Sequence, residues 1–517
     1  MSPMHGDARW DADELFLTIH QIDQLLPSLE THCAEIACEL SGMEVTPQMF
    51  RRMGGMWLMH FVHQLAAINS EDSTENDLLD LTIPFDSWTH HQLFVGDSGY
   101  RSQIFSLIDL VKSGRIGKLK NAEVRGVGAP RTNRIRRGLE TLIQGPGRHH
   151  EVVTVVRPYI KQSLFSRMAA IRRTRRDVYW NDLEFAIEVG KAPNLSARKS
   201  LSIAIPVGGF ESLVRAALPL MLPTCFSEEL SGIVKSIDLV SERTTAIYSA
   251  NGSQAHLPYQ IVSAMWGEKG TKILSHQHGG HQGLDEICAA ENYEVRASDR
   301  HYTMGWSDSR PSVKPLLVAM PQRASSLDRS RLLLMSLANS TVAYRLQPFC
   351  LPSHVQRCAS ETRQFIGNLK WPTKPVVRCE SADITTLKLP ESVSYEDFDL
   401  PGTVSASRSG LVIHNYLGVS WLETLAMNIP TVCFVPKGIH RFRAAAQPFI
   451  DALANVGIIH YSGREAADFV NSLRGSPSSW WRLAEVQEAR EAFVARYANF
   501  SENWLEAWQA EFESLLA

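Results

Sequence analysis

A short segment rich in histidine and glycine is the first place in this sequence where residue types and spacing could do chemistry. It runs from Ser275 to Gly283 as Ser-His-Gln-His-Gly-Gly-His-Gln-Gly, directly after the strand-like run Lys272–Leu274. Open α/β sheets keep their sites at the carboxyl ends of strands, and glycine lets the backbone approach a ligand closely. An imidazole can take a proton from a hydroxyl group near neutral pH. We therefore predict catalytic roles for His278 and His281, and a loop-shaping role beside a bound acceptor for Gln277, Gly279 and Gly280.

Two other interpretations of this segment stay open. It could be a Gly-rich turn whose imidazoles bond only to the backbone. It could also hold zinc, since His276, His278 and His281 are suitable ligands by type. Alternation along an extended chain points His276 and His278 the same way and leaves His281 unplaced, so we predict no metal site.

A second segment, from Leu411 to Val432, has the pattern of a strand, a Gly-containing turn, a helix, a proline stop and another strand. A helix N-terminus favours a phosphate through its free N–H groups and its dipole. Ser420 and Glu423 are three residues apart and share a helix face, where a carboxylate can accept hydrogen bonds from two ribose hydroxyls. The same Ser-x-x-Glu spacing is also that of a capping box, which would use both side chains on the backbone. The predicted nucleotide contacts are His414, Tyr416, Gly418, Ser420 and Glu423.

Carboxylates near the histidine segment are further candidates. Asp299 lies shortly after it and could act as a base or nucleophile, or orient an imidazole. It could instead cap a helix or pair with Arg300. Asp285 and Glu286 are weaker candidates, because a solvated charge is their default.

The elements that must position these residues follow from periodicity. Apolar residues recur at helical spacing up to about Lys112, and β-branched or apolar runs then alternate with helical patterns, which is typical of a doubly wound α/β domain. A proline-containing linker is expected over 307–323. The predicted strands are Val152–Val156, Leu201–Val207, Thr245–Ser249 and Lys272–His276, then Arg331–Ser336, Val376–Cys379, Gly410–His414, Thr431–Phe434 and Gly457–His460.

The fold class is therefore α/β, with two Rossmann-like lobes, a helical N-terminal extension and C-terminal helices. The expected units are a helical region over 1–115, a first lobe on the acceptor side over 116–315, a second lobe on the nucleotide-donor side over 325–475, and C-terminal helices over 476–517. Tryptophans such as Trp480, Trp481, Trp504 and Trp508 are expected to pack those helices back onto the lobes.

Composition and charge narrow the class of protein and its expected location in the cell. The chain has 517 residues and a net charge of −3, which argues against bulk nucleic-acid binding. Its eight cysteines form no CxxC pair, and Met1–Trp10 has no apolar core, so we expect reduced thiols, no signal peptide and a cytoplasmic protein. The cluster Arg172–Arg176 is either a solvated helix face or a contact for anionic lipid at the inner membrane.

The second segment resembles the donor-nucleotide half of glycosyltransferases of the GT-B fold. More closely, the chain is similar to a family of transferases found in surface-polysaccharide and O-antigen gene clusters, and more loosely to bacterial transferases of the acidic sugar Kdo. The matching residues are Trp57-Leu58, Gln277-His278-Gly279-Gly280, Ser298-Asp299-Arg300, Gly305-Trp306, the block from Ser420 to Pro430, Gly457-Ile458-Ile459 and Trp480-Trp481.

The resemblance implies a glycosyltransferase that moves a sugar from a nucleotide donor to a glycan or lipid-linked glycan acceptor of surface polysaccharide. It implies no tightly bound cofactor, a donor that is itself a substrate, with a CMP-sugar such as CMP-Kdo favoured, and peripheral contact with the inner membrane or polysaccharide-assembly proteins. It also places Arg345 beyond the first strand of the second lobe, near the donor phosphate; an ordinary surface arginine is the alternative. Three other functions stay open, namely a CDP-polyol phosphotransferase, a nucleotide-sugar epimerase and a nucleotide- or glycan-binding protein without catalysis.

Overall fold

The computed structural model describes residues 10–69, 98–119, 152–158, several positions between 170 and 183, 193–238, 244–336, 345–379, 381–396, 400–473 and 476–517. Much of the basic stretch between Lys120 and His150 therefore lies outside the described residues, as do three of the four arginines of the cluster at 172–176. The fourth, Arg173, pairs with Glu506 at 2.7 Å.

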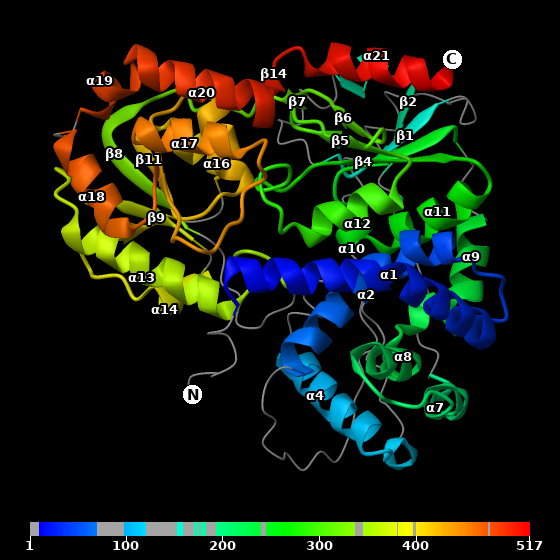
Figure 1. Cartoon of the computed structure of the whole chain (residues 1–517). Helices are drawn as coiled ribbons and strands as arrows, with labels where there is room; N and C mark the ends of the chain where they lie inside the picture. Colours follow the sequence, from blue (N-terminus) through cyan, green and yellow to red (C-terminus); the bar gives the residue numbers. More distant parts are fainter. Residues whose placement is uncertain are drawn as a thin grey trace.

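The first lobe is built on a parallel sheet with strand order β2-β1-β3-β4-β5-β6 (Figure 1). Buried β-branched and aromatic residues fill these strands, as expected for a sheet covered on both faces. The described strands are β1 (Val153–Val156), β2 (Val178–Trp180), β3 (Ala246–Ser249), β4 (Lys272–His276), β5 (Arg300–Thr303) and β6 (Val313–Pro315).

The second lobe repeats this plan with strand order β10-β9-β8-β11-β12-β13, again with parallel pairs. Its described strands are β8 (Asp328–Met335), β9 (Val376–Arg378), β10 (Ser394–Tyr395), β11 (Ser409–His414), β12 (Thr431–Phe434) and β13 (Ile459–His460). The predicted α/β architecture of two Rossmann-like lobes is therefore confirmed.

Helices surround both sheets, and in the first lobe some of them pack on the N-terminal helices and not on the sheet. In the first lobe they are α7 (Leu195–Ile203), α8 (Phe210–Met221), α9 (Leu230–Asp238), α10 (Gly252–Ala255), α11 (Leu257–Glu268) and α12 (Ala289–Ala297). In the second lobe they are α13 (Pro352–Asn368), α14 (Ser381–Leu387), α15 (Gly402–Ser407), α16 (Val419–Ala426), α17 (Gln447–Asn455), α18 (Gly463–Ser472) and α19 (Pro477–Trp481).

The N-terminal helices α1 (Ala12–Ser41), α2 (Pro47–Asn69) and α4 (Ser98–Lys112) share one hydrophobic core with the helices of the first lobe. Helix α1 lies across both lobes in Figure 1. Near its start, Trp10 accepts a hydrogen bond at 3.2 Å from His354 of the second lobe. Further along, Glu30 pairs with Arg296 of the first lobe. The predicted helical character of this region is confirmed, and α1 also ties the two lobes together.

The C-terminal helices form a second tie on the other side of the molecule (Figure 1). Helix α20 (Ala484–Tyr497) packs on the second lobe, and α21 (Trp504–Leu516) packs on the first sheet. Between them, β14 (Phe500–Ser501) pairs with β7 (Val318–Ala319). The predicted tryptophan packing is confirmed, since Trp480, Trp481, Trp504 and Trp508 are all buried.

Two predictions about elements were wrong. The segment Leu201–Val207 is not a strand, because α7 runs through Ile203 after Asn194 caps it by accepting a hydrogen bond from Ala197 at 3.2 Å. Its alternating apolar residues are not a buried face, since Ile203 is 60% exposed. The expected linker over 307–323 contains β6, which closes the edge of the first sheet, and β7.

All eight cysteines are free. A helix able to cross a membrane is absent from the described part of the chain.

Candidate functional site

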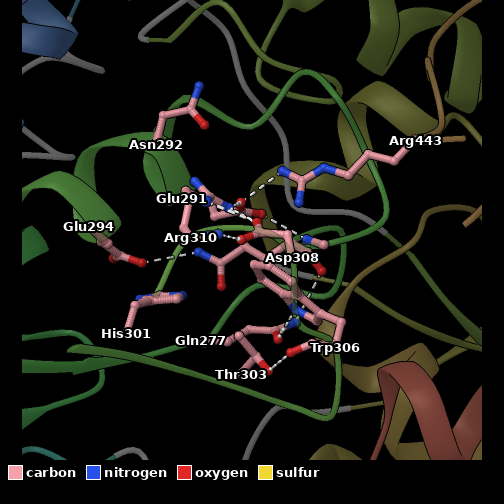
Figure 2. Close-up of polar contacts among 12 residues, drawn as sticks. Gln277, Glu291, Asn292, Glu294, His301, Thr303, Trp306, Asp308, Arg310 and Arg443 are labelled. Carbon is pink, nitrogen blue, oxygen red and sulfur yellow. Dashed lines mark hydrogen bonds and ion pairs between the residues drawn. The ribbon is translucent and has the colours of Figure 1, made fainter. Parts of the chain in front are cut away.

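The histidine loop follows the last residue of β4, and Gln277 fixes its shape. The side-chain oxygen of Gln277 accepts hydrogen bonds from the backbone of Met304 at 2.9 Å and from the indole of Trp306 at 2.8 Å. Its amide nitrogen donates to the carbonyl of Gly279 at 2.9 Å. The loop is therefore held to the residues that follow β5 (Figure 2).

His278 stands in front of a buried carboxylate. Its Nδ1 lies 3.6 Å from Oε1 of Glu294, a residue of α12 whose side chain is fully buried. Gln254 and Gln282 each donate to Glu294 at 3.0 Å. Burial raises the pKa of Glu294, while His278 and the two amides act in the opposite direction. A carboxylate behind an imidazole orients the ring, and the His278 side chain keeps 16% of its surface exposed.

The other two imidazoles of the loop point elsewhere. His276 is buried among Tyr248, Tyr302 and Trp508, and burial lowers its pKa to about 4. The ring nitrogen Nε2 of His281 contacts the side-chain amide of Gln347 in the second lobe. Burial, followed by the charge of Arg345, lowers the pKa of His281 to about 3. His281 is therefore neutral near pH 7 and joins the lobes. The turn interpretation fits His276, whose Nδ1 contacts the Gln277 carbonyl at 2.9 Å.

The second motif forms the expected strand, turn and helix. Helix α16 begins at Val419 with Gly418 as its N-cap, and no described side chain caps it. Ser420 therefore lies inside the helix, so Ser420 and Glu423 do not form the capping box. The hydroxyl of Ser420 lies 3.3 Å from that of Tyr416, and Glu423 is 3% exposed.

His414 is buried too deeply to contact a nucleotide directly. It is the last residue of β11, has no exposed surface, and its Nε2 lies 3.1 Å from the hydroxyl of Thr424. Burial lowers its pKa to about 3. In this structure His414 contacts α16 through Thr424 from the interior of the lobe.

The two motifs meet at their glycines. A Cβ atom placed on Gly280 would lie 2.2 Å from the carbonyl carbon of Gly418 and 2.7 Å from the backbone nitrogen of Val419. Only glycine fits there, because both contacts are to backbone. The histidine loop of the first lobe thus rests directly on the start of α16 in the second.

Arg345 is also brought to this junction. It is 7% exposed, and Nη2 lies 3.7 Å from the sulfur of Cys350. His63 of α2 holds the adjoining backbone, since its Nδ1 accepts a hydrogen bond from Leu346 at 3.0 Å. Burial and then the charge of Arg345 lower the pKa of His63 to about 3. Arg345 is therefore buried between α2 and the histidine loop and is not a surface arginine.

Asp299 lies at the wrong edge of the sheet for the predicted catalytic role. Its Oδ2 accepts a hydrogen bond at 2.7 Å from Ile273, near the start of β4, and its carboxylate faces Arg52 at 3.3 Å. His278 follows the end of the same strand, which is five residues long, or about 16 Å. Proximity in sequence misled the prediction, because β4 and β5 run parallel and Asp299 precedes β5.

The sequence analysis missed several residues at the junction. Glu291 is fully buried and accepts hydrogen bonds from Arg310 at 2.8 Å, from Arg443 of the second lobe at 2.7 Å and from the backbone of Gly283 at 2.7 Å (Figure 2). Asp285, expected to be a solvated charge, is fully buried and pairs with His440 of the second lobe. The sequence feature that could have indicated His440 is its position shortly after the carboxyl end of β12.

Comparison with known proteins gives a family. A family model described as a LIC12162 family transferase matches residues 132–512, which is well over half of the chain. No curated protein matches the chain.

Several solved structures are similar at low identity. The spinosyn rhamnosyltransferase SpnG complexed with spinosyn aglycone has 11% identity and a TM-score of 0.38, with 71% of this chain and 100% of that chain covered. Anabaena HepE in complex with UDP and glucose has 10% identity and a TM-score of 0.38 at the same coverage. The wall teichoic acid polymerase TagF has 10% identity and a TM-score of 0.37, covering 80% of this chain and 96% of that one. This likeness is too distant to carry a residue role or a substrate between proteins.

Proposed function

Because the chain belongs to the LIC12162 family of transferases, we propose that it is a glycosyltransferase that moves a sugar from a nucleotide-activated donor to a surface-polysaccharide acceptor. The observation that carries this proposal is the contact of Gly280 with Gly418 and Val419. It joins a loop with a carboxylate-backed imidazole to the start of a helix suited to phosphate. Those are the two parts that such a transfer needs.

In the proposed reaction the donor nucleotide binds the second lobe. The start of α16 and Arg345 lie near its phosphates, and Tyr416, Ser420 and Glu423 contact the nucleoside. His278 takes the proton from an acceptor hydroxyl while the acceptor oxygen bonds to the anomeric carbon. The bond between that carbon and the phosphate oxygen breaks, and its electron pair leaves with the nucleotide. Glu294 keeps the His278 ring in position and stabilises the imidazolium that forms.

The finer parts of the proposal rest on the resemblance of the motifs. We propose an acidic sugar such as Kdo, delivered as its CMP derivative, and a glycan or lipid-linked glycan acceptor that brings the enzyme to the inner face of the membrane. We propose no tightly bound cofactor, since the donor is consumed as a substrate.

Nucleotide binding tests the donor site directly. Calorimetry with CMP, CDP, UDP, GDP and ADP is expected to show selective binding, weakened about tenfold or more in Glu423→Ala because a bidentate contact to ribose is lost. The matched control is Glu465→Ala, which removes an exposed carboxylate from α18 of the same lobe. Selective CMP binding would support the acidic-sugar donor. If no nucleotide binds, the proposal is wrong.

Product analysis distinguishes the proposed glycosyltransferase from a CDP-polyol phosphotransferase. A glycosyltransferase leaves a glycosidic bond in the product and releases the nucleotide, whereas a CDP-polyol phosphotransferase leaves a phosphodiester. Membership of a transferase family gives no support to the epimerase or to a binding protein without catalysis. Mass spectrometry of the acceptor product after incubation with the bound nucleotide's sugar and polyol derivatives distinguishes the two transfers.

A further inference from the structure

A second pair of an imidazole and a carboxylate spans the two lobes. His440 follows β12 of the second lobe, and Asp285 follows the histidine loop of the first. Nδ1 of His440 lies 2.5 Å from Oδ2 of Asp285, and the two side chains are 3% and 0% exposed. The other oxygen of Asp285 accepts a hydrogen bond from Ile287 at 3.0 Å, which fixes the carboxylate. A buried carboxylate in this position orients the ring.

The His440 ring lies in a group of aromatic side chains that reaches the start of α16. The ring stacks on Phe442 with 5.2 Å between centroids and lies 5.0 Å from the ring of Phe349. Phe349 in turn contacts Tyr416, beside the start of α16. Nε2 of His440 has no hydrogen-bond partner among the described residues, although a buried polar atom is normally paired.

Several charged or titratable groups of the described residues lie near His440. Besides Asp285 they include His281 on the histidine loop and His354 on α13, as well as Arg441, its neighbour in sequence. Burial is the main cause of the low pKa values of His281, about 3, and His354, about 4, and the charge of His440 lowers both further. His440 differs from these two rings because it belongs to the second lobe and is paired with Asp285 of the first.

We propose that Nε2 of His440 binds the phosphate that leaves with the donor nucleotide, with Asp285 of the opposite lobe as its positioning residue. This inference rests on the proposed function, because it names the residue that receives the leaving group. When the sugar–phosphate bond breaks, negative charge grows on the phosphate oxygen, and the Nε2–H of a protonated His440 donates to that oxygen. Charge-assisted bonds of this kind are strong in a buried site. The phosphate site is complete only while the lobes are together.

Phosphate binding tests the assignment. The probes are the five nucleotides named above, inorganic pyrophosphate, and uridine and cytidine as phosphate-free controls. His440→Ala should weaken the binding of the phosphate-containing probes about tenfold, because a charge-assisted hydrogen bond to the phosphate is lost. Nucleoside binding should not change.

Two further variants separate this role from a structural one. His440→Gln keeps a side-chain donor, so the binding of the phosphate-containing probes should partly recover. Asp285→Asn should weaken the binding of these probes, because the ring of His440 loses the carboxylate that orients it. His460→Gln, which changes an imidazole bonded to the Gly457 carbonyl in the same lobe, is the matched control and should behave as the unmutated protein.

The outcomes distinguish this inference from the proposed function. If Glu423→Ala weakens nucleotide binding while His440→Ala and His440→Gln leave the affinity for every probe unchanged, the donor site stands and the inference is overturned. If no nucleotide binds, the proposed function is wrong, and the inference about its leaving group is overturned with it even where pyrophosphate binds. Equal binding of every phosphate probe to the unmutated protein and to His440→Ala overturns it.

Discussion

The backbone of Gly280 in the first lobe lies against the backbone of Gly418 in the second, so closely that a methyl group on Gly280 would be 2.2 Å from the Gly418 carbonyl carbon. This contact fixes how near the histidine loop comes to α16. A single added carbon atom at Gly280 would therefore change the spacing between the lobes.

Gly280→Ala should therefore push the loop away from α16. A methyl forced against backbone costs about 1–3 kcal/mol of stability, and a misplaced site loses about a hundredfold in rate. Thermal unfolding and product formation measure the two effects. Gly279→Ala is the stability control, because its added Cβ would meet only side-chain atoms of Gln282 and His281 at 3.5–3.6 Å. Equal melting temperatures for the two variants would contradict the steric argument.

Glu294→Gln should lower the turnover rate by about tenfold to a hundredfold, because His278 loses the carboxylate that orients it. Nucleotide affinity should stay the same, since Glu294 lies in the first lobe. Steady-state kinetics and calorimetry on the same preparation check both statements. A parallel loss of nucleotide affinity would show that Glu294 acts on the fold and not on His278.

The buried ion pairs of Glu291 should matter for stability more than any surface pair. Glu291→Gln leaves Arg310 and Arg443 without their shared carboxylate and is expected to cost about 3 kcal/mol or more in denaturant unfolding. Arg310→Gln should cost less, because Arg443 remains on Glu291. If both variants unfold at the same denaturant concentration, Glu291 does not hold the lobes together.

Stability should fall as the medium becomes acidic, because several buried imidazoles stay neutral in the folded protein. Burial lowers the pKa of His414 from its ordinary value of 6.5 to about 3. Between these two values the unfolded chain binds a proton that the folded chain does not. Each such group therefore removes about 1.4 kcal/mol per pH unit as the pH falls through this window.

Replacing His414 with Asn should reduce that dependence by about the same amount per pH unit, whatever its effect on stability at pH 7. Chemical unfolding at a series of pH values between about 6 and about 4 gives the slope. The control is His20→Gln, since His20 is exposed on α1. An unchanged slope in His414→Asn would show that His414 is protonated in the folded protein.

Local patterns predicted the strands well where burial and β-branching coincide. The bounds of β4 and β12 are those expected, because Ile273 and Leu274, and Val432 and Cys433, are buried on both faces of a sheet. The strand predicted around Ile203 was wrong, because the alternation of apolar residues there is equally compatible with a helix that leaves Ile203 in solvent. Periodicity alone does not decide which neighbour covers a segment.

Candidate site residues can be read from the sequence only where suitable side chains and the end of a predicted strand fall together. His278, Ser420 and Glu423 satisfy that condition and stay predictions, whereas Asp299 precedes a strand and lies at the opposite edge of the sheet. The pairing of His440 with Asp285 joins residues 155 positions apart, and it depends on how the lobes dock. No local pattern contains that information.

The two ties between the lobes set the kind of motion that the enzyme can make. Helix α1 reaches the second lobe through Asp13, which pairs with Arg441 at 2.6 Å, and α20 reaches the first through Arg496, which donates to the Ser307 carbonyl at 3.0 Å. Because α1 and α20 lie on opposite sides of the two lobes (Figure 1), the lobes cannot swing apart about either helix alone while the contacts of both helices hold. The exposed pair Asp13–Arg441 is the weaker of these contacts. The lobes are also joined by the buried pairs Glu291–Arg443 and Asp285–His440, so we expect any separation of the lobes to require that these buried pairs break as well.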